Sequence, residues 1–211
     1  MTGPPTRHDQ MIRAVHNSMA RMRSDTGISD PEHDQFRTVR RFVDFTEVTA
    51  DIHEVLCKGI PVAQVNLEIA VPLGNFARAQ RSLATWHEAA RPRLHYPVIL
   101  RATGPSAAWL SPAHGKESVY FGFVVYLGRD GCVPDHALRY LAQIQELLAA
   151  EGGRPHWGKY FDVGAFDLRS AYARWDEFSA VRRAMDPAGR FENEFVRSVF
   201  GSVTADVVRA W

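Results

Sequence analysis

The fold is decided by two adjoining segments, SVYFGFVVYL (118–127) and DHALRYLAQIQELLAA (135–150). The first is rich in β-branched and aromatic residues and ends at Gly128, which is typical of a strand. The second repeats apolar residues at three- and four-residue spacing, which indicates an amphipathic helix. Because Gly152 and Gly153 follow it, we expect the helix to end there.

The sequence before these segments adds two strands and a helix. VAQVNLEIAV (62–71) alternates apolar and polar residues, so it predicts a half-buried strand. YPVILRATG (96–104) is a second β-rich run. Between them an apolar stripe at helical spacing predicts a helix that Asn75 caps and that ends before Pro92.

Beyond residue 153, helical patterns cover 167–185 and 191–200, separated by the turn DPAG (186–189). The order strand, helix, strand, strand, helix predicts an α+β fold, with an antiparallel sheet and helices packed on one face. The other face must then be covered by another part or bind something.

The N-terminal part differs from the rest. Residues 1–41 are polar, with one amphipathic segment, MIRAVHNSMARMR (11–23), so we expect an extension there and the main domain over 42–211.

Composition narrows the range of partners and locations. The 211 residues hold 25 Lys+Arg and 24 Asp+Glu, a net charge of +1, which argues against a nucleic-acid or anionic-membrane partner. No run approaches the roughly 18 apolar residues of a membrane span, and the N-terminus lacks an apolar leader. Cys57 and Cys132 are the two cysteines, and the histidines are scattered, so neither a disulfide framework nor a metal site is expected. We therefore expect a cytoplasmic protein.

One segment carries a chemical signature, GGRPHWGKYF (152–161). It concentrates Arg154, His156, Trp157 and Lys159 directly after the glycine terminator. This resembles the HWGK-type motif of the FAD-linked aldonolactone oxidases, a family of L-gulonolactone, D-arabinono-1,4-lactone and alditol oxidases within the vanillyl-alcohol oxidase superfamily.

The resemblance covers about residues 52–201 and implies a cap, or substrate, domain of the vanillyl-alcohol oxidase type. The further motifs that carry it are VNLEIAVP (65–72), HYPVILRAT (95–103), WLSP (109–112), KESVYFGF (116–123) and MDPAGRFENEFVRSVFG (185–201). Family members also carry a flavin-binding domain with a glycine-rich pyrophosphate loop, which this sequence lacks. The resemblance therefore implies a substrate domain standing alone, with no cofactor of its own and FAD supplied through a partner chain; cofactor-binding residues are left unassigned.

The resemblance also points to catalytic residues. Arg101 occupies the position of the family's strand arginine, and Lys159 that of the HWGK lysine, which lies near the reacting carbon and the flavin. The family has a glutamate where this sequence has Ile99. Period-two geometry places Ile99 and Arg101 on one strand face.

The substrate-binding candidates are less polar than in the family. In alditol-oxidase-like members the next strand supplies a histidine and a threonine, where this sequence has Gly122 and Val124. Tyr120 shares their strand face, although simple core packing would explain that pattern too. Asn66 and Glu68 are weaker candidates, expected on an exposed strand face. The remaining candidates, from the HWGK-type motif, are His156 and Trp157.

Three hypotheses stay open on these residues. The first is the small-molecule-binding half of a split FAD-dependent oxidoreductase, whose exposed sheet face meets a flavoprotein. The second is a flavin-independent isomerase or cyclase, in which Lys159 and Arg101 polarise a carbonyl or transfer protons. The third is a non-catalytic binding protein that covers its sheet face by forming a homo-oligomer. In each enzyme hypothesis the ligand is a less hydroxylated small molecule, because an unpaired sugar hydroxyl would cost about 1–3 kcal/mol.

Overall fold

The computed structural model describes residues 64–92, 98–127 and 131–201. Within them lies an antiparallel four-stranded sheet of order β2-β3-β1-β4. Its strands are β1 (Gln64–Pro72), β2 (Ile99–Thr103), β3 (Ser118–Tyr126) and β4 (Arg154–Pro155). The helices are η2 (Leu73–Asn75), α3 (Phe76–Ala90), α4 (Asp135–Ala150), η3 (Val163–Ala165), α5 (Leu168–Ala171), α6 (Trp175–Met185) and α7 (Glu194–Phe200).

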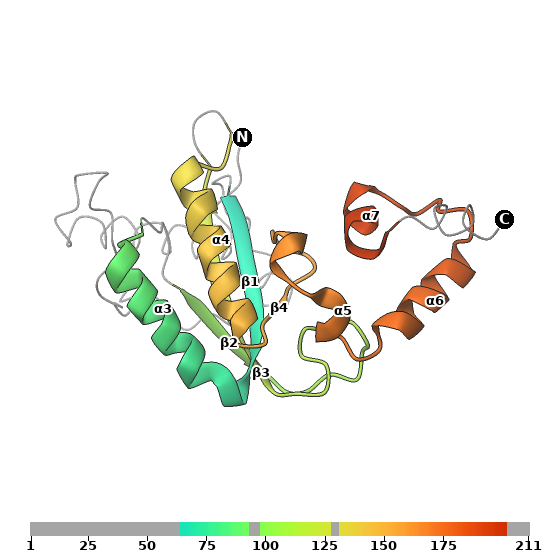
Figure 1. Cartoon of the computed structure of the whole chain (residues 1–211), viewed down its shortest axis with the longest axis horizontal. Helices are drawn as coiled ribbons and strands as arrows, with labels where there is room; N and C mark the ends of the chain where they lie inside the picture. The colour runs from blue at the N-terminus through green and yellow to red at the C-terminus, as the bar shows by residue number, and fades with distance from the viewer. Residues whose placement is uncertain (1–63, 93–97, 128–130, 202–211) are drawn as a thin grey trace, which may run out of the picture.

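The α+β prediction is confirmed, since α3 and α4 lie along one face of the sheet while α5 to α7 extend to the side (Figure 1). The predicted strands and the helices α3, α4 and α7 lie close to their expected positions, whereas the helical run expected over 167–185 is divided into α5 and α6, and β4 was not predicted. The helix predicted over 11–23 and the start of the main domain at residue 42 fall outside the described residues. No helix of the described part is long and apolar enough to cross a membrane.

The prediction that the side chain of Asn75 caps α3 was wrong. Asn75 does stand at the N-cap position of α3, but its side chain makes no cap hydrogen bond. Its Nδ2 donates instead to the carbonyl oxygen of Glu151, at 2.9 Å. The side chain therefore ties the start of α3 to the end of α4.

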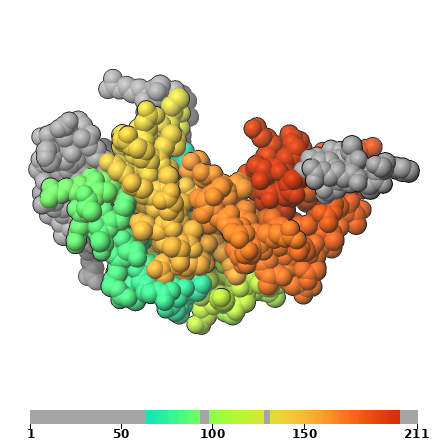
Figure 2. Space-filling model, in the orientation of Figure 1, coloured from blue at the N-terminus to red at the C-terminus, as the bar shows by residue number. Residues whose placement is uncertain are grey.

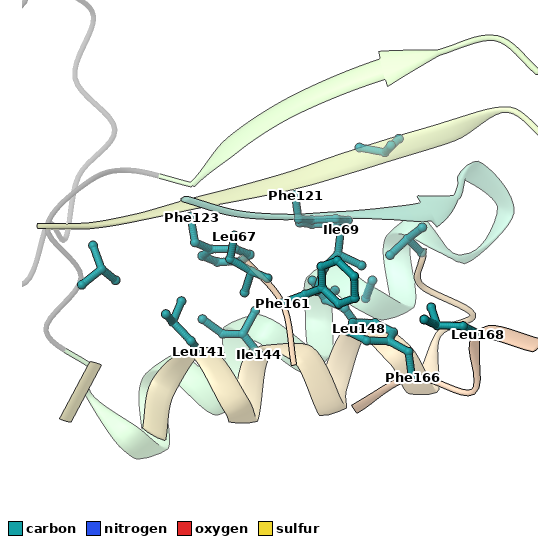
Figure 3. Close-up of a cluster of buried hydrophobic side chains, with 14 of the residues drawn as sticks. Leu67, Ile69, Phe121, Phe123, Leu141, Ile144, Leu148, Phe161, Phe166 and Leu168 are labelled. Atoms are coloured by element: carbon teal, nitrogen blue, oxygen red, sulfur yellow. The ribbon is translucent and has the colours of Figure 1, made fainter. Parts of the chain in front are cut away.

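The strand register separates the two faces of the sheet. Ile69 of β1 and Leu100 of β2 both pair with Phe121 of β3, and directly paired residues point to the same face. On this face the side chains pack against α4, as Figure 3 shows. The fully or nearly buried members of this core include Leu67, Ile69, Phe121, Phe123, Leu141, Ile144 and Leu148. Each such side chain contributes about 1.5–3 kcal/mol through its burial.

The glycine pair after α4 brings β4 against β1. Gly152 has a φ of +75°, the left-handed conformation of a helix terminator. A Cβ on Gly153 would stand 2.4 Å from the carbonyl oxygen of Leu148 and 2.8 Å from Cγ2 of Ile69. Only glycine allows this approach, so the pair sets where the HWGK-type segment begins its path along β1.

The C-terminal helices form an arm that is joined by aromatic contacts. Trp175 of α6 stacks on Phe200 of α7, with ring centroids 4.6 Å apart. Arg182 of α6 forms an ion pair with Glu192 at 2.9 Å, largely shielded from solvent. Figure 2 shows that the molecular surface is hollowed between α4 and this arm.

Candidate functional site

The sheet face that points away from α3 and α4 carries most of the predicted site residues. One cross-strand row runs from Ile99 through Gly122 to Glu68, because Gly122 pairs with both neighbours. In the next row, Arg101 pairs with Tyr120. The register thus brings these residues of β2, β3 and β1 together on one face.

An ion pair crosses this face. Nη1 of Arg101 donates to Oε1 of Glu68 at 2.5 Å, although the two residues lie on strands separated by β3. A Cβ at Gly122 would stand 3.8 Å from that Nη1 and 3.4 Å from the Cβ of Ile99. Gly122 therefore lies directly beside the guanidinium, and a side chain larger than a methyl group there would compete with Arg101 for space.

Glu68 is buried, with only 7% of its surface exposed, so its expected place on an exposed strand face was wrong. The side chain of Arg101, in contrast, is 56% exposed. A buried carboxylate requires a charged or hydrogen-bonding partner, and Arg101 supplies it. The guanidinium also keeps N–H groups that a ligand can reach.

The expectation of an exposed sheet face is corrected at its centre. Ala70 and Val124 lie on this face and are almost fully buried. Val124 pairs with Asn66 in the row beyond Glu68. The accessible part of the face lies toward β2, where Arg101 and Thr103 are exposed.

Tyr120 and His156 meet beside the ion pair. Their rings are in edge contact, with centroids 6.5 Å apart. Burial raises the pKa of the Tyr120 phenol, and the charge of Glu68 raises it further, against the opposing effect of a hydrogen bond with Thr103. The phenol therefore stays protonated at neutral pH and can donate a hydrogen bond.

The HWGK-type segment is fastened to the edge of β1. The amide of His156 donates to the carbonyl of Glu68, and the amide of Tyr160 to the carbonyl of Asn66, both at 2.9 Å. Between these two hydrogen bonds the chain forms a turn that points away from β1. A 3.0 Å hydrogen bond from the Lys159 amide to the His156 carbonyl closes this turn. Lys159, partly exposed, thus sits in a fixed turn beside the buried carboxylate's strand.

The imidazole of His156 has a defined tautomer when it is neutral. Its Nδ1 accepts a 3.1 Å hydrogen bond from the amide of Gly158. The neutral ring must therefore carry its proton on Nε2. This N–H is a donor available to a ligand or to a proton transfer.

Trp157 is held by packing contacts. Its ring stacks on Tyr172 and Phe200, with centroids 5.6 and 6.3 Å away, and meets the edge of Phe161 at 5.8 Å. Its Nε1 donates to the carbonyl of Leu110 at 2.7 Å. Through these contacts Trp157 anchors the HWGK-type segment to the C-terminal arm.

Replacing Trp157 with phenylalanine is expected to reduce the free energy of unfolding by about 1–2 kcal/mol, because the Leu110 carbonyl loses its donor. Ligand affinity should stay within about twofold of wild type. Urea unfolding and a ligand titration measure the two effects. Trp86→Phe is the matched control, since Trp86 donates to Gln143 in an exposed hydrogen bond. A large loss of affinity with unchanged stability would contradict the anchoring role.

Sequence reasoning missed the role of Glu68 and the contact between Tyr120 and His156. The glycine at 122, within a run of β-branched and aromatic residues, was the available signal for an open position. No described helix begins at a glycine-rich loop that could cradle a pyrophosphate. Among the described residues no group of three or more His, Cys, Asp or Glu side chains is placed to hold a metal ion.

Comparisons with known proteins show which proteins the chain is similar to. The family model of D-arabinono-1,4-lactone oxidase matches residues 7–199. L-gulono-1,4-lactone dehydrogenase of Mycobacterium tuberculosis is 30% identical over 188 residues, which is 89% of this chain and 38% of that protein. Alditol oxidase of a Streptomyces species is 35% identical over 100 residues, 47% of this chain and 23% of the relative. L-gulonolactone oxidase of Bos taurus is 33% identical over 106 residues, 50% of this chain and 24% of the relative. The chain thus spans well under half the length of these relatives.

Proposed function

The chain belongs to the D-arabinono-1,4-lactone oxidase family, and from this premise we propose that it forms the small-molecule-binding half of a split FAD-dependent oxidoreductase. The observation that carries the proposal is the fastening of the HWGK-type turn to β1 at Glu68, whose side chain pairs with Arg101. The HWGK-type motif and the ion pair between Arg101 and Glu68 therefore meet at one residue, Glu68. The α+β fold agrees with a cap domain of the vanillyl-alcohol oxidase type.

In this proposal the substrate lies against the accessible side of the sheet face. Arg101 and Lys159 donate to a carbonyl or enolate oxygen and stabilise the negative charge that develops on it. A flavin bound to a partner chain would accept the hydride from the substrate. Ile99, Gly122 and Val124 offer no side-chain partner for hydroxyl groups, and each hydroxyl left unpaired costs about 1–3 kcal/mol. A substrate with few hydroxyl groups fits best.

The C-terminal arm supports a protein partner. Met185 at the end of α6 is 82% exposed and Phe191 is 85% exposed. The loop between them is well fixed, because the carboxylate of Asp186 accepts hydrogen bonds from the amides of Arg190 and Phe191, both at 2.8 Å. Large apolar side chains on an ordered loop are typical of an interface. We assign this surface to the flavoprotein, with a second copy of the chain as the other occupant, and place the complex in the cytoplasm.

The double variant Met185→Ser, Phe191→Ser should lower the apparent affinity for the partner, flavoprotein or second copy, by at least tenfold, because both side chains lose apolar burial in the complex. Analytical ultracentrifugation and co-purification from the native host measure it. Leu73→Ser, at a 46% exposed position outside the arm, is the control. Unchanged association of the double variant would contradict this interface.

Reconstitution tests the proposed function. The chain and the partner flavoprotein are assayed with a lactone and an artificial electron acceptor, separately and mixed. The proposal expects substrate-dependent reduction of the acceptor only in the mixture. Equal reduction by the flavoprotein alone would contradict a substrate-binding role for this chain.

A flavin-independent isomerase or cyclase is the second candidate. The observation that favours it is the convergence of a carboxylate, a phenol and an imidazole, from Glu68, Tyr120 and His156, beside Arg101. These groups can accept and donate protons without a redox cofactor. Turnover of a carbonyl substrate by flavin-free chain, lost in Lys159→Met, would favour this candidate over the split oxidoreductase.

A further inference from the structure

We propose that Glu68 is a specificity-determining residue: its carboxylate, paired with Arg101 beside Gly122, makes the site favour a neutral carbonyl ligand over a carboxylate ligand. The inference rests on the proposed function, in that this sheet face holds the substrate. It adds a residue to the site and gives the site a charge preference.

The negative charge of this sheet face stands next to the proposed position of the substrate. Ile99 and Gly122 belong to a cross-strand row on the face where the substrate is proposed to lie. Glu68 lies in the same cross-strand row, since Ile99 pairs with Gly122 and Gly122 pairs with Glu68. Side chains of one row share a face. The carboxylate of Glu68 on β1 therefore lies on the same face as Ile99 of β2.

The electrostatics of the ion pair favour a neutral ligand. Arg101 and Glu68 form a pair of zero net charge at 2.5 Å. A ligand oxygen that binds the exposed N–H groups of Arg101 comes close to the carboxylate of Glu68. A neutral carbonyl oxygen accepts a hydrogen bond there without a charge penalty. A ligand carboxylate is attracted by Arg101 but opposed by Glu68, so the pair does not repay the cost of removing the ligand's charge from water. Glu68 is buried, so its charge is screened less than that of an exposed carboxylate, although the exposed Arg101 leaves the ligand in contact with water.

The space at Gly122 is limited. The position where its Cβ would stand is 3.8 Å from Nη1 of Arg101. A Cβ at 122 would make ordinary van der Waals contact with Arg101 and Ile99, so position 122 accepts a small residue while a side chain longer than a methyl group would compete with Arg101 for this space.

The test uses γ-butyrolactone and 4-hydroxybutyrate, a neutral lactone and the carboxylate formed by its hydrolysis. Their affinities for the full chain are measured by NMR titration. Wild type should bind the lactone about tenfold more tightly than the carboxylate, and Glu68→Gln should shift that ratio about tenfold toward the carboxylate. Glu68→Asp should keep the wild-type preference. Glu88→Gln, which removes an exposed carboxylate on α3, is the control and should leave the ratio unchanged.

The possible results distinguish a wrong role for Glu68 from a wrong location of the substrate site. Arg101→Met should weaken the binding of both probes, which places them at this site. If Arg101→Met weakens binding but Glu68→Gln leaves the ratio at its wild-type value, the specificity role of Glu68 is wrong and the binding site stands. If neither probe binds, or Arg101→Met has no effect on either, the proposed substrate face is itself wrong.

Discussion

Replacing Lys159 with methionine is expected to lower the turnover of the complete oxidoreductase by about 10²–10³-fold. Methionine keeps much of the side-chain length and removes the ammonium group that donates to the developing negative charge. The turn that carries Lys159 is closed by backbone hydrogen bonds, including that from its own amide to the His156 carbonyl. The substitution should therefore leave the fold unchanged.

Steady-state kinetics of the complex measure this effect, and kcat should fall much more than KM rises, since the interaction strengthens in the transition state. Lys116→Met is the matched control, because Lys116 is exposed in the loop before β3 and should retain wild-type kcat. Full activity of Lys159→Met, or an equal loss in both variants, would remove Lys159 from the catalytic site.

Replacing Gly153 with alanine is expected to reduce the free energy of unfolding by about 3 kcal/mol. The new methyl group would stand 2.4 Å from the carbonyl oxygen of Leu148, a backbone atom that cannot rotate away, and 2.8 Å from Cγ2 of Ile69. Either α4 or β4 must shift. Because the HWGK-type segment follows directly, the hydrogen bond from the His156 amide to Glu68 should weaken as well.

Urea unfolding followed by circular dichroism measures the loss of stability. Gly74→Ala is the control, since a Cβ at Gly74 meets no atom within 4 Å, and its stability should stay within about 0.5 kcal/mol of wild type. A Gly153→Ala protein as stable as this control would contradict the close approach of β4 to β1.

Local patterns predicted the secondary structure well. The helix expected over 135–150 is α4 at those residues, because its apolar spacing and its glycine terminator act within a few turns of chain. The strand expected over 118–127 is β3, one residue shorter. Asn75 shows the limit of local rules, since a contact with Glu151, 76 positions away, replaces its capping bond.

The site was predictable only in part, for a physical reason. Resemblance singled out Arg101, but its partner Glu68 is set by strand order and register, which depend on contacts between distant segments. Alternation placed Glu68 on the polar face of its strand without indicating its burial. In the same way, the motif singled out Trp157, while its packing against Tyr172 and Phe200 follows from the path of the C-terminal arm.

The visible absorbance spectrum of the chain, purified alone and with its partner from the native host, tests the central claim most directly. No flavin band is expected for the isolated chain, even after incubation with FAD. A flavin band is expected in the partner complex, bleached anaerobically by a substrate in wild type and far more slowly in Arg101→Met. Tight FAD binding by the isolated chain, or substrate bleaching that is indifferent to Arg101, would contradict the central claim.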